Sequence, residues 1–329
     1  MFRLKKNENP LLTVISHNDC VDHEIFDKEH PETPARIRSV WQGLSSLSDE
    51  LNVDFIAPKS CKLSELYTVH PKEYLDRLES CCLAAKPWFM SADCAVSEDS
   101  FRAIRASASC ALESANLLLK HSPSFTMVRP PGHHAGPETA EGFCFINHIA
   151  IAIDKIRQTE PDKNFLIIDF DVHHGNGIDT FYSADPHAFY FSIHGSPAHI
   201  YPHTGYADEK GQEKGYGFTK NITLALGAVR EEWMEQFRLG LNEVLKSFQP
   251  DYILVAAGFD AHVQDPYGLM NLEDQDYFDM FTMIWDGAQK HSNGALALYL
   301  EGGYSVDVLE RLVPKMVEYW ADLQKSLHA

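Results

Sequence analysis

The chain has 329 residues, of which 44% are hydrophobic and 23% charged, a composition typical of a globular protein. Its formal net charge of −19 argues against a nucleic-acid-binding protein, which needs a basic patch, and is compatible with a cationic substrate. The sequence contains no apolar run of about 18 residues and no apolar core of a signal peptide at its N-terminus. We therefore expect neither a membrane span nor secretion.

The chain has seven cysteines, an odd number, and contains no CxxC motif. Such a set suits neither a disulfide framework nor a structural zinc site. We expect reduced thiols and a cytoplasmic protein.

Predicted strands and helices alternate along the chain. Apolar runs predict strands at 11–16, 53–56, 125–128, 188–194, 221–226, 252–257 and 295–300, and a further buried strand that begins at 165. Helices are predicted at 34–47, 63–82 with a break at 70–71, 97–120, 147–158, 229–248, 274–290 and 305–327. This alternation predicts a single α/β domain over 1–329, with a central parallel sheet and helices on both faces.

Polar side chains follow the strand that begins at Phe165. Asp171 and His173 are two residues apart, and in an open α/β sheet ligands bind beyond the carboxyl ends of the strands. A carboxylate beside an imidazole suits zinc or a similar divalent metal. The alternative is a buried Asp–His hydrogen bond at a strand end. His133–His134, Asp260 and Tyr304 follow other predicted strands, and this clustering favours the metal site.

Three ligands, Asp171, His173 and Asp260, would leave one coordination position open, as in catalytic zinc sites. His133 and His134 follow a Pro-Pro-Gly turn and offer two imidazoles for general acid–base catalysis, although loop histidines can also be ordinary surface residues. Candidate partners that could orient these two rings and set their tautomers are Asp169 and Asn176.

Three aromatic residues complete the candidate site. Tyr304 follows a Gly-Gly turn, so its phenol could donate to a developing oxyanion, whereas a lone tyrosine is more often a packing residue. Phe143 and Tyr201 lie in loops rich in glycine and proline and could wall a narrow channel, the alternative again being simple packing. The long loop 195–218 is typical of a binding loop.

Five motifs together resemble the zinc-dependent histone deacetylase family. They are Arg129–His134, Gly142–Asn147, Asp169–Gly177, Gly258–His262 and Glu301–Tyr304, in family order and spread over most of the chain from His30 onward. The resemblance implies the arginase-like deacetylase fold and zinc on Asp171, His173 and Asp260. It also implies that His134 is the general base, that His133 is its electrostatic partner or acid, and that Tyr304 polarises the carbonyl.

The same resemblance implies a structural potassium ion near the end of the strand that begins at 165. Its ligands would come from Asp169, Asp171, His173, Ser192 and Ile193. Asn176 stands where some members of the family carry Asp, which is similar to the class II and bacterial branch.

The substrate prediction depends on the loops. The segments Phe191–Pro197, Tyr201–Pro202 and Gly205–Glu209 resemble bacterial acetylpolyamine amidohydrolases, which favours a small cationic acetylated amine. Tyr267 stands where polyamine-selective eukaryotic relatives carry Glu, but an aromatic face can also hold a cation. The predicted substrate-binding residues are Asp93, Gly142, Phe143, Tyr201 and Tyr267.

Other functions stay open at this stage. The first is removal of acetyl groups from protein acetyllysine. More remote are a two-metal ureohydrolase, suggested by Asp260 and Asp265–Pro266, and a catalytically silent sensor of acetylated amines. The sequence leaves a homo-oligomer open.

Overall fold

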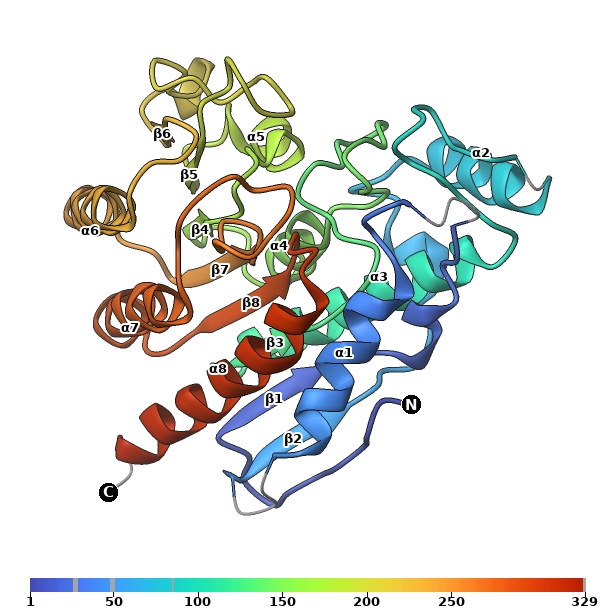
Figure 1. Ribbon diagram of the computed structural model, residues 1–329, viewed down its shortest axis with the longest axis horizontal. Coiled ribbons are helices and arrows are strands. Elements are labelled where there is room, and N and C mark those ends of the chain that lie inside the picture. The colour runs from blue at the N-terminus through green and yellow to red at the C-terminus, as the bar shows by residue number, and fades with distance from the viewer. Residues whose placement is uncertain (26–28, 48–50, 85, 328–329) are drawn as a thin grey trace.

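The computed structural model describes residues 1–25, 29–47, 51–84 and 86–327, and its strands form one eight-stranded sheet in the order β2-β1-β3-β8-β7-β4-β5-β6 (Figure 1). Every pairing between these strands is parallel. The strands are β1 Leu12–Ile15, β2 Val53–Ile56, β3 Ser124–Thr126, β4 Phe165–Asp169, β5 Ala188–Gly195, β6 Thr219–Leu224, β7 Tyr252–Ala257 and β8 Leu296–Leu300.

Helices cover both faces of this sheet, as the alternation predicts (Figure 1). The α-helices are α1 Pro34–Ser45, α2 Lys72–Leu83, α3 Ser100–Leu118, α4 His148–Arg157, α5 Asn176–Tyr182, α6 Arg230–Ser247, α7 Asp274–His291 and α8 Val306–Ser326. Short 3-10 helices occur at Asn18–Val21, Leu63–Glu65 and Glu213–Gly215. Helices α1, α6, α7 and α8 share one hydrophobic core with the sheet, and α3, α4 and α5 share another.

The central strand β4 shows why the sheet needs helices on both faces. Its side chains alternate, so that Leu166 and Ile168 enter the core under α1, α6, α7 and α8, while Phe165 and Ile167 enter the core under α3 and α4. All five residues of β4 are buried, which is typical of an inner parallel strand. The only polar residue of β4, Asp169, is its last one, and there the site begins.

Most predicted elements are confirmed, with ends shifted by a few residues. The break predicted at residues 70–71 separates the 3-10 helix at Leu63–Glu65 from α2. The strands predicted at 125–128 and 221–226 begin one and two residues earlier, as β3 and β6. The helix α5 was not predicted; the structure places Gly175 directly before its first residue and Gly177 in its first turn.

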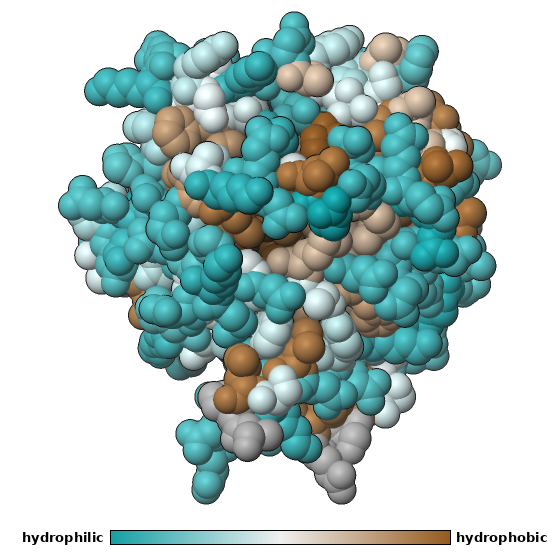
Figure 2. Space-filling model, turned by 90° about the vertical axis from the view of Figure 1, so that its left-hand side faces the viewer, coloured by the Kyte–Doolittle hydropathy of each residue, from teal (hydrophilic) through white to brown (hydrophobic). Residues whose placement is uncertain are grey.

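The face that carries α6 and α7 is mostly hydrophilic, with apolar side chains scattered over it (Figure 2). Both helices are amphipathic, and their apolar sides, which include Phe237, Leu241, Met280 and Ile284, are buried against the sheet. Among the described residues, no helix is long and apolar enough to cross a membrane.

Candidate active site

Asp171, His173 and Asp260 meet beyond the ends of β4 and β7. Each offers one ligand atom, and these atoms all lie within 4.8 Å of one another. His173 Nδ1 is 3.1 Å from Asp171 Oδ1 and 3.1 Å from Asp260 Oδ2. The two strands pair in register, so their carboxyl ends bring residues about 90 positions apart to one point.

This group fits a divalent metal ion. Both carboxylates are fully buried, and burial together with the charge of Asp171 raises the pKa of Asp260. Two buried like charges with one imidazole are costly unless a cation neutralises them. The backbone also approaches closely, since a Cβ on Gly302 would lie 2.2 Å from Asp260 Oδ2. Two carboxylates and one imidazole are a donor set that zinc accepts.

The tandem histidines lie beside the metal-binding group, and each has its own partner. His133 Nδ1 lies 3.1 Å from Asp169 Oδ2, and His134 Nδ1 lies 2.7 Å from Asn176 Oδ1. Burial lowers the pKa of His133, but Asp171 and Asp169 outweigh it and raise that pKa to about 10. Burial and the charge of His133 hold the pKa of His134 well below its usual value. The two carboxylates therefore favour a proton on His133, whereas burial and His133 favour the neutral form of His134.

Tyr304 is held at the end of β8 by contacts with its backbone and its ring. Asp265 Oδ2 accepts hydrogen bonds from Tyr304 N at 2.6 Å and from Ser305 N at 3.0 Å. The guanidinium of Arg36 lies 5.0 Å from the centre of the Tyr304 ring and donates to Gly303 O. Burial raises the pKa of Tyr304 well above its usual value, so the phenol keeps its proton and can donate it in a hydrogen bond.

A cavity of about 200 Å³ joins these groups to the surface. Its walls come from six loops, and they contain all five predicted substrate-binding residues. The lining residues are Asp93, His134, Gly142, Phe143, His173, Tyr201, Tyr267 and Tyr304.

We call this cavity the site cavity. One part of its wall is a tight turn from Glu141 to Cys144. The two end residues exchange backbone hydrogen bonds of 3.1 and 3.0 Å, and Gly142 and Phe143 between them have φ of +56° and +66°. A Cβ on Gly142 would lie 2.2 Å from His134 Cδ2, so only glycine lets the turn approach the imidazole. The positive φ of Phe143 is strained backbone of the kind that is concentrated at functional sites.

Two further features lie around the end of β4. His174 lies outside the metal-binding group: its Nδ1 is 2.9 Å from Thr204 Oγ1, and its ring packs on that of His194 at 5.0 Å. Ser192 pairs in register with Asp169, so the predicted potassium ligands are neighbours on adjacent strands.

The sequence did not predict the contacts by which four residues brace the site. Glu301 Oε2 accepts from the backbone N–H groups of Gly132 and His133 at 2.6 and 3.1 Å. Arg36 and Asp265 hold the Tyr304 segment, and Glu141 contacts Asn176. Of the four, only Glu301 could have been found from the sequence, because this charged residue ends an apolar strand directly before the Gly-Gly turn that carries Tyr304. The other three lie far from their partners in sequence.

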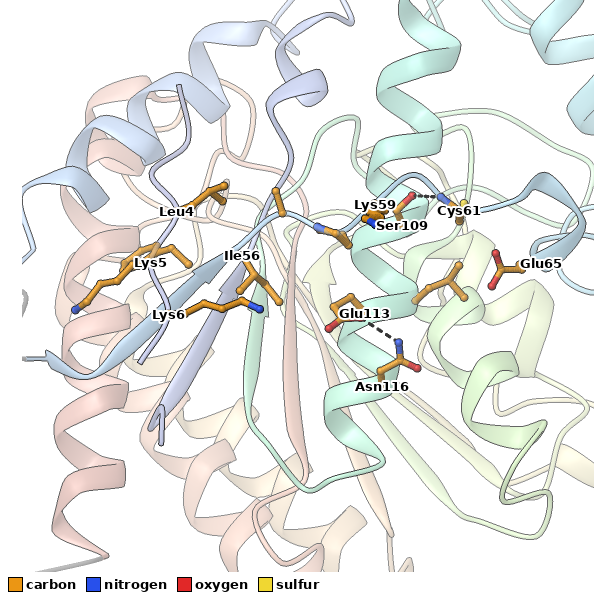
Figure 3. Close-up of a pocket in the computed structure, with 14 residues that line it drawn as sticks. Leu4, Lys5, Lys6, Ile56, Lys59, Cys61, Glu65, Ser109, Glu113 and Asn116 are labelled. Carbon is orange, nitrogen blue, oxygen red and sulfur yellow. Dashed lines mark hydrogen bonds between the residues drawn. The ribbon is translucent and has the colours of Figure 1, made fainter. Parts of the chain in front are cut away.

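A second cavity, of about 630 Å³, shares no residue with the site cavity. It lies between the N-terminal segment, the end of β2 and α3, and is lined by Lys5, Lys6 and Lys59 among others (Figure 3). Its polar side chains partly satisfy one another: Asn116 donates to Glu113 at 3.0 Å, and Ser109 accepts from Cys61 N at 2.9 Å. We assign it no catalytic role.

Comparison with known proteins agrees with this geometry. The family model described as histone deacetylase domain matches residues 30–320. A probable deacetylase of Methanothermobacter thermautotrophicus is 35% identical over 91% of this chain and 87% of its own. A histone deacetylase-like amidohydrolase of Pseudomonas aeruginosa is 32% identical over 84% of this chain and 72% of its own.

The fold has the same relatives. The crystal structure of the HDA15 HD domain superimposes with a TM-score of 0.84 at 30% identity, covering 93% of this chain and 89% of that one. The predicted arginase-like deacetylase fold is thereby confirmed. With a family model that spans most of its length and relatives above 30% identity, the chain belongs to the histone deacetylase family and is a hydrolase that acts on amide bonds.

Proposed function

We propose that this protein is a zinc-dependent acetylpolyamine amidohydrolase, in which 1–329 forms one catalytic domain. The observation that carries the proposal is the site cavity, because its lining brings together the proposed metal ligand His173, His134, Tyr304 and every predicted substrate contact. The seven cysteines are free and buried, which supports a reducing compartment such as the cytoplasm.

Asp171, His173 and Asp260 would hold the zinc ion, which would polarise the acetyl carbonyl and acidify water. His134 is neutral and takes the proton of the attacking water as general base. Tyr304 donates a hydrogen bond to the carbonyl oxygen as negative charge develops on it. Cationic His133 stabilises that charge, and a proton passes from an imidazole to the leaving amine, so that acetate and a free amine result.

The preference for a small cationic amine follows from the charges around the site cavity. Asp93 lines it, and Glu141 lies behind Tyr201, whose pKa is raised first by burial and then by these two carboxylates. A negative field attracts an ammonium group. Exposed Tyr267, at the rim and 5.3 Å from the Tyr304 ring, offers a face for cation–π contact.

A structural potassium ion is a further part of the proposal. Asp169, Asp171 and His173 lie on one strand end, with Ser192 and Ile193 on the adjacent strand β5. Oxygen atoms gathered in this way suit a hard cation.

The two-metal ureohydrolase is less well supported. Among the described residues, one group of three metal-ligating side chains is found, and Asp265, a candidate second-metal ligand, is engaged by the backbone of Tyr267, Tyr304 and Ser305. Metal analysis of the purified protein should give about one tightly bound transition metal per chain.

Substrate comparison tests the proposal. We expect kcat/KM on acetylputrescine, acetylcadaverine and monoacetylspermidine to exceed that on an acetyllysine peptide by at least about tenfold, since a cation recognised at the rim contributes on the order of 1 kcal/mol or more. A kcat/KM on the acetyllysine peptide that is tenfold higher than on the acetylpolyamines would instead identify protein acetyllysine as the substrate.

Tyr304→Phe separates an enzyme from a silent sensor. It removes the hydroxyl but keeps the ring against Arg36, so we expect kcat to fall about 10²- to 10³-fold while substrate affinity changes little. Single-turnover assays and calorimetric binding measure the two quantities. A wild-type protein that binds acetylated amines but turns none over would be a sensor.

A further inference from the structure

Glu141 lies directly behind the wall of the site cavity, half-buried, at the first position of the turn that carries Gly142 and Phe143. Its Oε1 accepts a hydrogen bond of 2.9 Å from Asn176 Nδ2, and its Oε2 accepts one of 3.3 Å from the hydroxyl of Tyr201. Both carboxylate oxygens are thus directed at site residues rather than at solvent.

The bond to Asn176 decides which way that amide points. A carboxylate can only accept hydrogen bonds, so the amide nitrogen of Asn176 must face Glu141. The amide oxygen then faces His134 Nδ1, 2.7 Å away. An oxygen at this position accepts only from a protonated Nδ1, and this leaves Nε2 of the neutral ring with its lone pair free.

We propose that Glu141 is a positioning residue, which fixes the reactive tautomer of His134 through the side-chain amide of Asn176. The inference rests on the proposed role of His134 as general base. Asn176 alone does not specify the tautomer, because an amide rotated by 180° presents its NH₂ group to Nδ1. That rotamer favours a proton on Nε2, where the ring cannot take a proton from water. Glu141 excludes it.

The backbone on both sides of the contact between Glu141 and Asn176 is held in place. Backbone hydrogen bonds to Cys144 fix its main chain, and α5 begins at Asn176, so both ends of the contact stand on ordered segments. The contact joins residues 35 positions apart. An exposed carboxylate on the same loop, Glu138, provides a matched control.

Substitutions of Glu141, measured in the zinc-loaded enzyme, test the proposal. Glu141→Met removes the acceptor, and we expect kcat to fall about tenfold with KM changed less than about twofold. In Glu141→Gln the side-chain amide can either accept from Asn176 or donate to it, so the constraint on Asn176 weakens and kcat should fall by about threefold, less than in Glu141→Met. Glu138→Met should behave as wild type.

The decisive arm is Asn176→Asp, which sets two carboxylates against each other. We expect a loss of about 30-fold in kcat, and recovery to within about threefold of wild type when Glu141→Gln is added, because the new amide donates to the new carboxylate. A merely structural role predicts losses that multiply in the double variant. Such multiplication, or full activity of Glu141→Met, would overturn the proposal.

A readout independent of turnover separates this inference from the base role. With ¹⁵N-labelled imidazoles, and His134 assigned by its absence in His134→Asn, the wild-type ring should carry its proton on Nδ1. In Glu141→Met the signal should shift toward the Nε2-protonated form. An Nε2 proton in the wild-type enzyme would refute the proposal. If His134→Asn retains turnover, the base role fails, while the tautomer measurement still decides the role of Glu141.

Discussion

The two ends of the central strands differ sharply. At the amino ends of β4 and β7 the buried contacts are mostly aromatic: Phe165 stacks on Tyr252 with ring centres 5.6 Å apart, and Arg157 lies over the Phe165 ring. At the carboxyl ends Asp171 and Asp260 are just as deeply buried but are ionisable. Burial at one end stabilises the fold, whereas burial at the other costs free energy.

The residues of one sheet therefore fall into two groups, those at the amino ends of the strands, which stabilise the fold, and those at the carboxyl ends, which form the site. Two like charges buried side by side are retained where their chemistry is needed, and they lower the stability of the fold there. Substitutions at the carboxyl ends should therefore change activity far more than stability, and substitutions at the amino ends should do the reverse.

The largest effect is expected from Asp260→Asn. The amide removes a metal ligand, so kcat/KM should fall by at least about 10³-fold, and zinc should no longer raise the melting temperature. Because one of two like buried charges disappears, the metal-free variant should melt no lower than the metal-free wild type. Thermal melts with and without chelator measure both effects.

Asp251→Asn is the matched control for Asp260→Asn, because it makes the same chemical change at the opposite end of β7. Asp251 forms a partly exposed ion pair with Lys163 at 3.0 Å, so we expect less than about 1 kcal/mol of lost stability and unchanged turnover. Equal effects of the two substitutions on activity would contradict the division between the strand ends.

Leu296→Ala tests the amino ends directly. Leu296 is the first residue of β8, is 1% exposed and pairs with Ile253. Its loss should cost about 3 kcal/mol in the free energy of unfolding, through lost burial and the cavity left behind, with kcat/KM within about twofold. Urea unfolding and assays well below the melting temperature measure the two quantities. A tenfold fall in kcat/KM of the folded variant would show that the two ends are coupled.

The sequence predicted the strands well, and it predicted which side chains meet at the candidate metal site, for a physical reason. Apolar runs such as Phe165–Ile168 determine where strands form, and parallel pairing brings their carboxyl ends together without further information. Thus Asp171 and Asp260 could be paired from their position after a strand. The helix α5 was missed because Gly175 and Gly177 lower local helix propensity, and packing around Ile178 and Tyr182 overrides it.

The bracing contacts were beyond sequence reasoning because no periodic pattern encodes them. Glu141 reaches Asn176 through a turn with two positive φ angles, only one of which is at a glycine. Arg36 reaches Gly303 across 267 positions. Such contacts depend on loop conformation, which composition constrains weakly.

His70 sharpens the comparison, since it is a buried titratable group that belongs neither to the candidate metal site nor to the lining of the site cavity. Its Nε2 accepts from Asn147 N at 2.9 Å, and its Nδ1 lies 3.0 Å from Pro137 O. Burial lowers its pKa to about 4, although the Pro137 carbonyl opposes this. The unfolded chain, with a histidine pKa near 6.5, therefore binds more protons between pH 6.5 and pH 4, and stability falls as pH falls through that window.

From these two values His70 alone should make the protein about 2 kcal/mol less stable at pH 5 than at pH 8. His70→Gln keeps an acceptor for Asn147 and a donor for Pro137 but does not titrate, so its loss of stability between pH 8 and pH 5 should be smaller by that amount. Urea unfolding at both pH values measures the difference, with exposed His187→Gln as the control. If His70→Gln and the wild type lost stability equally on acidification, the pKa of His70 would be the same in the folded and the unfolded chain, and its burial would cost nothing on protonation.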